Sequence, residues 1–229
     1  MKRSNAEIIQ EYGPLPGIAA VGGVTFDGQN IWLAAGDTLC ALDPASGELL
    51  RAIDVPAPAG TAFDGKHLFQ LAGEVIRKID VATGDVLATI AAPPGGVNSG
   101  LAWAEGSLWL GRYSERKIFQ IDPESGAVMR TIESNRFVTG IAWVDGELWH
   151  GTWEAEESEI RHIDAQTGEV IEALVMPQGA GVAGLESDGK DRFFCGGGSS
   201  GKVRVVRRPS RGASVAGVQV QGGADTPSR

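Results

Sequence analysis

The stretch Ser99-Gly-Leu-Ala-Trp-Ala-Glu-Gly-Ser-Leu-Trp109 recurs 40 positions later (139 − 99 = 40) as Thr139-Gly-Ile-Ala-Trp-Val-Asp-Gly-Glu-Leu-Trp149. An acidic-Gly pair marks both of these copies and three further units, at Asp27-Gly28, Asp64-Gly65, Glu105-Gly106, Asp145-Gly146 and Asp188-Gly189. Internal repetition with a period of roughly 20–50 residues is typical of solenoids and propellers. The repeat therefore restricts the fold before any single residue is considered.

Each unit contains two turn signals that divide it into short strands. An acidic-Gly pair between apolar runs predicts a hairpin, since Gly adopts the positive φ of a tight turn. An aliphatic-Asp pair followed by Ser/Thr-Gly predicts a second turn, as in Ile121-Asp122 and Ser125-Gly126. No amphipathic run of helical length lies between these turns. We therefore predict an all-β protein, a five-bladed β-propeller of four-stranded antiparallel blades.

The two ends of the chain are predicted to meet. The fifth unit provides only three strands before Pro209, whereas Ile8–Tyr12 resembles the outermost strands of the other units. We expect Ile8–Tyr12 to close the ring as the fourth strand of the last blade, a frayed N-terminal arm being the alternative. The repeat has no internal linker, so we predict a single domain over residues 1–209. Residues 210–229 have little to bury and are predicted to form a disordered tail.

Composition limits the classes of partner. The net charge of −9 argues against nucleic acid, because phosphate binding needs a basic surface. No apolar run reaches membrane-spanning length, and the first residues lack the apolar core of a signal peptide. Cys40 and Cys195 are expected to be buried free thiols, which suits a reducing compartment. We therefore expect a cytoplasmic monomer that binds neither nucleic acid nor membrane.

The variable loops carry the candidate site. In a propeller the two recurring turns share one face, and the remaining loops share the other, over the mouth of the axial funnel. These remaining loops are minimal in units one and two and polar or aromatic in units three and four. We expect an off-axis cleft there, which binds a small molecule or a peptide. The candidate ligand-binding residues are Trp153, Trp149, Tyr113, Asn98, Arg136, Phe137 and Glu156, and the candidate catalytic residues are His150, Arg112 and Glu154.

Several of these candidates also have structural interpretations. Trp149 recurs at one strand position as Trp32 and Trp109, which favours packing, whereas Trp153 occurs in no other unit and favours a ligand platform. His150 is either a packed, hydrogen-bonded residue or a general base. Arg112 either neutralises an anionic ligand or pairs with a Glu of the neighbouring loop, Glu154 or Glu156. No cluster of residues has metal-ligand spacing, so we expect no metal and no cofactor.

The segment Trp143-Val-Asp-Gly-Glu-Leu-Trp-His-Gly-Thr-Trp153, with Ile160–Val170, resembles glutaminyl-peptide cyclotransferases, also called glutamine cyclotransferases. The resemblance implies a five-bladed propeller that converts an N-terminal glutamine to pyroglutamate, without a metal in the plant-type enzymes. Three positions of the family pattern differ here. Its Gln is Ser99, its Glu thought to act as acid/base is Leu110, and its Asn is Gly151.

These differences leave the activity open. Cyclisation needs a group that shuttles a proton, and Leu110 cannot do so. The chain is therefore either a cyclotransferase-like acyltransferase or a non-catalytic propeller that binds a ligand or a protein. A third interpretation rests on Gly100–Gly126, which also resembles the repeat of streptogramin-B lyases. That family has seven blades and needs a metal, and its Glu is missing from Trp109-Leu-Gly-Arg112.

Overall fold

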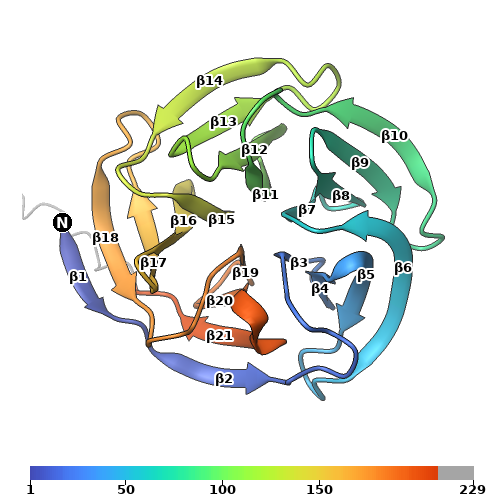
Figure 1. Ribbon diagram of the computed structural model, residues 1–229, viewed down its shortest axis with the longest axis horizontal. Helices are drawn as coiled ribbons and strands as arrows, with labels where there is room; N and C mark the ends of the chain where they lie inside the picture. The colour runs from blue at the N-terminus through green and yellow to red at the C-terminus, as the bar shows by residue number, and fades with distance from the viewer. Residues whose placement is uncertain (211–229) are drawn as a thin grey trace, which may run out of the picture.

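The computed structural model describes residues 1–210, and the predicted tail lies outside this range except for Ser210. Five antiparallel sheets surround a central axis as the blades of a propeller, which confirms the predicted fold (Figure 1). Within a blade the strands are called A to D from the axis outward. Blades one and two comprise β3 (Gly23–Phe26), β4 (Ile31–Ala34), β5 (Gly36–Leu42), β6 (Leu49–Ala57), β7 (Thr61–Phe63), β8 (His67–Ala72), β9 (Val75–Asp80) and β10 (Val86–Ala91).

The remaining blades repeat this meander. Blades three and four comprise β11 (Asn98–Ala104), β12 (Ser107–Arg112), β13 (Lys117–Ile121), β14 (Val128–Glu133), β15 (Val138–Val144), β16 (Glu147–Glu154), β17 (Glu157–Ile163) and β18 (Val170–Val175). Blade five comprises β19 (Gly184–Ser187), β20 (Arg192–Gly196), β21 (Val203–Arg207) and the N-terminal β2 (Ile8–Tyr12), with a short 3-10 turn at Gly198–Ser200.

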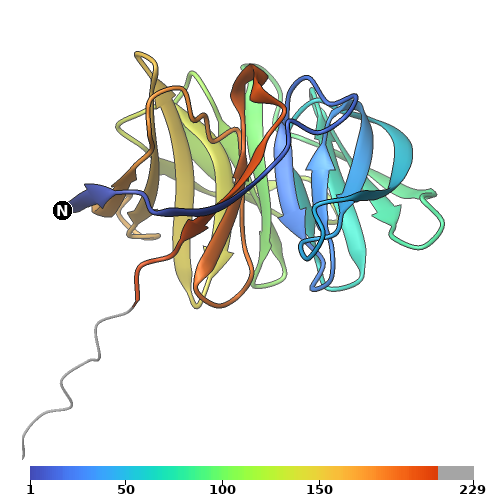
Figure 2. The ribbon, with the colours of Figure 1, turned by 90° about the horizontal axis from the view of Figure 1, so that it is seen from below.

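The N-terminal segment closes the ring as the sequence predicts. Strand β2 pairs antiparallel with β21, and Figure 2 shows this segment crossing the outside of the last blade. Tyr12 ends β2 in the core, and its hydroxyl donates to Pro44 O of blade one at 2.8 Å. The sequence did not predict β1 (Lys2–Asn5), which adds to blade four as a fifth strand parallel to β18. The segment thus joins blades four, five and one.

A ring of glycines brings the five A strands together at the axis. It consists of equivalent residues at Gly23, Gly60, Gly100, Gly140 and Gly184. A Cβ on any of them would lie 2.2–2.6 Å from a backbone atom of the next blade. Only glycine permits so close an approach of neighbouring backbones.

Large side chains on the B strands fill the spaces between blades. Trp32, Trp109 and Trp149 occupy one B-strand position and are each at most 2 % exposed, so the repeated tryptophans are packing residues as predicted. Strand pairing places Phe194 at this position in blade five, opposite Glu186. Alignment of the unit sequences makes Phe194 equivalent to His150 instead. It was off by one residue, because the A–B turn of blade five is longer than in blades three and four.

Candidate functional site

A cavity of about 440 Å³ opens over the axis, on the face that carries the variable loops. Its lining comes from all five blades and consists of Gly22, Pro58, Ala59, Val97, Asn98, Ser99, Tyr113, Thr139, Trp153, Gly181, Val182, Ala183 and Gly198. The cavity is therefore axial, whereas the sequence predicted an off-axis cleft. The difference arises because the short D–A linkers converge on the axis, so blades one, two and five contribute backbone even though their loops are minimal.

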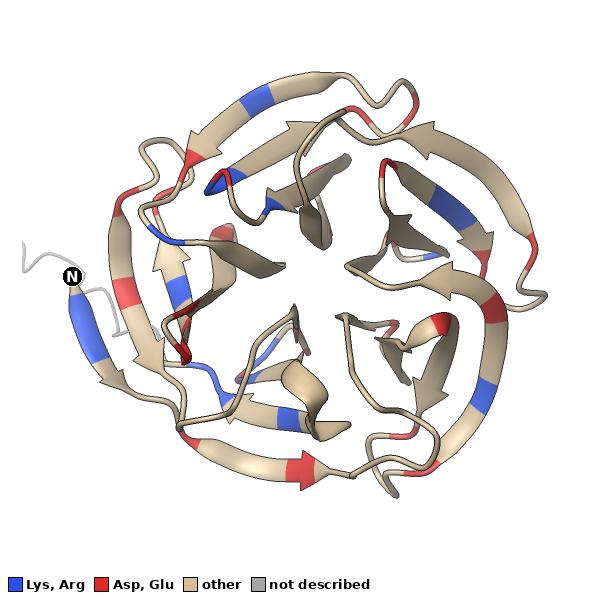
Figure 3. Ribbon diagram, in the orientation of Figure 1, with Lys and Arg blue, Asp and Glu red and all other residues tan. Residues whose placement is uncertain are grey.

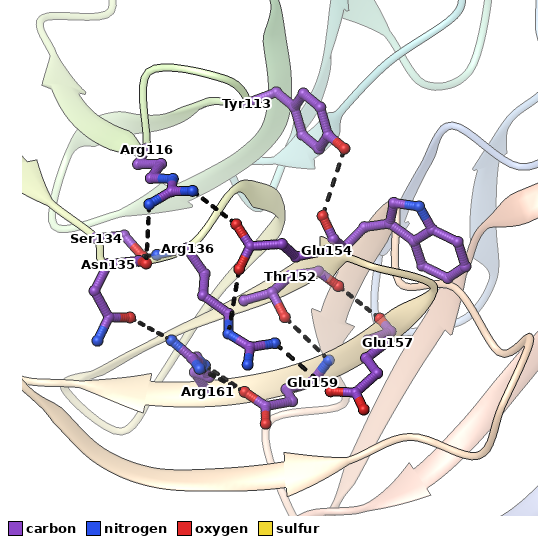
Figure 4. A network of polar contacts seen from close by, with 12 residues as sticks. Tyr113, Arg116, Ser134, Asn135, Arg136, Thr152, Glu154, Glu157, Glu159 and Arg161 are labelled. Carbon is purple, nitrogen blue, oxygen red and sulfur yellow. Dashed lines mark hydrogen bonds and ion pairs between the residues drawn. The ribbon is translucent and has the colours of Figure 1, made fainter.

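The aromatic wall of the cavity comes from blades three and four. Tyr113 follows β12 and Trp153 lies near the end of β16, and both side chains are partly exposed. The Tyr113 hydroxyl donates to Trp153 O at 3.4 Å and so connects the two blades (Figure 4). Phe137 packs behind this wall, with its ring centroid 4.9 Å from that of Tyr113. Phe137 thus supports the wall without lining the cavity.

Glu154 belongs to a cluster of charges beside the wall. Its carboxylate lies 2.7 Å from Arg116 and 3.5 Å from Arg136, which also approaches Glu157 at 4.0 Å (Figure 4). These residues join the B–C loops of blades three and four to the linker between them. Glu154 and Arg136 therefore hold the loop that carries Trp153, and neither lines the cavity. Glu156 is exposed in the turn that follows.

A second, buried ion pair lies below this cluster. Glu159 and Arg161 are 2.6 Å apart, and Arg3 from β1 approaches Glu159 at 2.9 Å (Figure 4 shows the Glu159–Arg161 pair). Burial acts to raise the pKa of Glu159, but the guanidinium of Arg161 outweighs it and keeps that pKa below its usual value. The pair is satisfied by the protein itself, so it offers no free charge to a ligand.

Arg112 is a structural residue. It is 2 % exposed, and its guanidinium donates to Pro93 O at 2.7 Å and to Glu115 Oε1 at 2.8 Å. Of the two alternatives that the sequence left open for Arg112, pairing with Glu154 or Glu156 is wrong, since its acidic partner is Glu115. Arg112 instead fixes the linker between blades two and three, because the carbonyls of Pro93 and Pro94 face it.

His150 is fully buried and does not line the cavity. Its Nδ1 lies 2.9 Å from Gly151 O, and since a carbonyl can only accept, Nδ1 carries the proton. Burial lowers the pKa of His150 to about 4. The ring is therefore neutral near pH 7. Of the two alternatives from the sequence, a packed, hydrogen-bonded histidine matches its surroundings. Trp149 likewise lies in the core between blades four and five, against Phe193.

Glu186 is a titratable residue that the sequence reasoning missed. It lies on β19 two residues beyond the glycine ring, at a position that holds Thr25, Ala62, Ala102 and Ala142 in the other blades. Thr25 donates to its Oε2 at 2.9 Å and the Ser187 N–H to its Oε1 at 2.8 Å. Neither partner is a cation, and burial raises the pKa of Glu186 to about 7. The sequence did contain a signal for this residue, since Glu186 stands at a repeat position that holds only small residues in the other four units.

Replacing Glu186 with Gln is expected to stabilise the protein at pH 8 by about 1–3 kcal/mol. The upper limit converts the full pKa difference between the folded and unfolded states into a free energy, and the lower limit allows for partial exposure of the side chain. The folded pKa of about 7 exceeds the ordinary 4.5, so the folded state binds the extra proton and stability falls as pH rises from 4.5 to 7. Urea unfolding of both proteins at pH 4.5 and pH 8 measures the gain, which should vanish at pH 4.5.

His150 provides an internal check on this expectation. Its lowered pKa gives the opposite slope, because the unfolded state binds the extra proton between about pH 4 and 6.5. With the opposing effect of Glu186 removed, the free energy of unfolding of Glu186→Gln should therefore rise with pH between about 4 and 6.5. A variant that is less stable than the natural protein at pH 8 would mean that the ionised carboxylate is stabilising.

Comparison with solved structures supports the fold. The chain is similar to the crystal structure of Myxococcus xanthus glutaminyl cyclase, with a TM-score of 0.75 and 20% identity over 90% of this chain and 97% of that one. It is also similar to the WD40 repeats of RRP9, with a TM-score of 0.54 and 11% identity over 89% of this chain and 97% of that one. No protein-family model and no curated protein matches the sequence.

Two further observations concern the described residues. Residues 1–210 contain no group of three or more His, Cys, Asp or Glu side chains arranged to hold a metal ion. Within the same range, no helix has the length and apolar character needed to cross a membrane. The propeller resembles that of a glutaminyl cyclase in its fold, and the axial cavity with its aromatic wall is the candidate site.

Proposed function

We propose that the chain binds a small molecule or the N-terminal end of a peptide in the axial cavity and does not catalyse a reaction on it. The observation that carries the proposal is the chemistry of the lining, which includes no carboxylate, imidazole, Lys or Arg side chain from residues 1–210. Figure 3 shows the charged residues mostly on outer strands and loops, away from the axis. Proton transfer in a cyclisation needs a group within hydrogen-bond reach of the substrate.

The three catalytic candidates fit this proposal. Glu154 is held by two arginines beside the wall, Arg112 binds backbone carbonyls, and His150 is enclosed in the core. Leu110, which stands where the resembling family has its Glu, is fully buried. The cavity volume of about 440 Å³ lies in the range of small-molecule sites. Trp153 provides a large flat surface for stacking.

A cyclotransferase is the second candidate, and the structural similarity to a glutaminyl cyclase favours it. An assay of ammonia release from glutaminyl peptides separates the two. We expect no release above the uncatalysed rate, with or without added divalent metal and across pH 5–9. Ammonia release that disappears in Trp153→Ala would contradict the proposal and support an enzyme.

The pair Trp153→Ala and Trp149→Ala tests where a ligand binds. Trp153 is partly exposed at the cavity, so its loss is expected to remove binding at little cost in stability. Trp149 is 2 % exposed, and its loss should destabilise the protein by about 3–5 kcal/mol. Urea unfolding measures stability, and native mass spectrometry of the purified protein measures retained ligand. Both side chains lie on the same face of β16, four residues apart, so the reverse pattern would mean that the core end and the cavity end of this face are assigned the wrong way round.

A further inference from the structure

The hairpin that joins β16 to β17 has a turn whose backbone conformation suits glycine, although neither of its residues is glycine. Glu154 pairs with Glu157 across the hairpin, which leaves a two-residue turn. The two residues, Ala155 and Glu156, have φ values of +53° and +63°. Positive φ at both positions is the conformation of a type I′ turn, in which Asn-Gly is preferred. An L side chain in this left-handed region crowds the following carbonyl oxygen, so the turn is strained.

Two other turns of the chain have the same conformation without this strain at the second position. They are the A–B turns Glu105-Gly106 and Asp145-Gly146, in which both residues have positive φ and the second is glycine. Within residues 1–210, the non-glycine residues with positive φ are the first residues of these two turns and three others, namely Arg116, Ala155 and Glu156. The three others all lie in the B–C loops of blades three and four, beside the cavity.

Charge also acts against this hairpin. Glu154 and Glu157 are directly opposite each other on neighbouring strands, where two like charges destabilise the pairing. Arg136, from the linker between blades three and four, lies 3.5 Å from Glu154 and 4.0 Å from Glu157. Arg116, from the B–C loop of blade three, lies 2.7 Å from Glu154 (Figure 4). Both compensating charges therefore come from outside the hairpin.

The base of the hairpin is fixed, which confines movement to its tip. Thr152 and Ser158 are both buried, and the Ser158 hydroxyl donates to Thr152 O at 2.7 Å. The Glu159 N–H donates to the Thr152 hydroxyl at 3.1 Å. Residues 153–157 lie beyond these bonds and are partly or fully exposed. Trp153, which lines the cavity, is the first residue of this tip.

We propose that residues 153–157 form a movable part of the cavity wall. The ion pairs of Arg116 and Arg136 hold this tip in place, against the strain of its turn and the repulsion between its two glutamates. Salt screens exposed ion pairs, so high ionic strength releases the tip, and Trp153 leaves the wall with it. A ligand that stacks on Trp153 binds only the held state, and its affinity therefore falls as salt rises. This consequence rests on the proposed binding function, whereas the movement itself is measurable without a ligand.

Hydrogen exchange of the full-length protein, followed by mass spectrometry, tests the movement directly. Amides of the hairpin exchange when the tip opens, so their rate reports the opening equilibrium. We expect exchange within residues 153–157 to become at least about tenfold faster between about 0.05 M and 1 M NaCl, because the ion pairs are screened. Arg136→Gln should cause a similar rise at low salt. Residues 103–108, which contain the A–B turn with Gly106, are the control in the same sample and should not respond.

A second variant distinguishes a strained turn from an ordinary mobile loop. Ala155→Asn combined with Glu156→Gly introduces the preferred residues of a type I′ turn and removes none of the ion pairs described above. Added to Arg136→Gln, this change should restore most of the lost protection. The matched control for loss of an arginine is Arg207→Gln, which removes an ion pair with Glu7 on the outer strands of blade five and should leave the hairpin unchanged.

Each outcome decides one part of the proposal. Exchange that responds neither to salt nor to Arg136→Gln would show that the ion pairs do not hold the tip. A turn variant that restores no protection would show that strain is not the opposing force. Rapid exchange of the tip in the natural protein at low salt would overturn the held state itself. If the hairpin responds as expected but native mass spectrometry finds no ligand in the cavity, the movable tip is supported and the binding function fails.

Discussion

Deletion of residues 1–13 is expected to lower the melting temperature by at least about 10 °C, which corresponds to a loss of several kcal/mol in a chain of this size. The deletion removes the ladder between β2 and β21 and leaves β21 as an open edge. It also removes Tyr12, which is 5 % exposed in the core between blades five and one. Differential scanning calorimetry of the two proteins measures the shift.

A shorter deletion provides the control. Removing residues 1–5 eliminates β1, whose residues are all exposed, and keeps β2 in place. Glu159 then loses Arg3 but keeps Arg161, so the expected shift is only a few degrees. If both deletions melted at the temperature of the full-length protein, the N-terminal strand would contribute nothing to ring closure. A large shift for the shorter deletion would place the closure at β1.

The fold was predictable because its determinants repeat. Five acidic-Gly turns and a missing strand in the last unit were sufficient to predict five blades and the pairing of the two ends. Strand β1 was not predictable, since Lys2–Asn5 has no apolar pattern and is held by pairs such as Lys2 with Glu172. The register of blade five was missed because its longer turn shifts β20 by one residue, which spacing alone does not reveal.

The candidate site was predictable only in part. Trp153, Tyr113 and Asn98 line the cavity, and what marked Trp153 was that it breaks the repeat. Arg112 and His150 were ambiguous because the same residue types serve both chemistry and structure. The carbonyls that bind Arg112 belong to Pro93 and Pro94, and a sequence does not state where backbone oxygens point. The contribution of all five blades to one cavity likewise follows from the convergence of the D–A linkers in space.

Gly100→Ala is expected to destabilise the protein by about 3 kcal/mol or more, on the scale of overpacking in a rigid core. The added Cβ would lie 2.2 Å from Thr139 O and 2.8 Å from Ile141 N, which are backbone atoms of the next blade. A flexible side chain could move aside, but here the inner strand of blade four would have to shift. Four other blades fix that strand through the same ring, so the change would strain the whole closure.

Gly106→Ala separates crowding from backbone strain. Gly106 has a φ of +72° in the A–B turn of the same blade, and a Cβ there meets no atom within 4 Å. Its substitution should cost only about 1 kcal/mol, the penalty of a left-handed conformation. Urea unfolding of both variants compares the two costs. Equal costs would mean that the inner strands can move apart around the axis. The strands would then tolerate an added Cβ that otherwise lies only 2.2–2.6 Å from a backbone atom of the next blade. A much larger cost for Gly100→Ala would identify the glycine ring as the feature that fixes the diameter of the propeller, and with it the width of the cavity above.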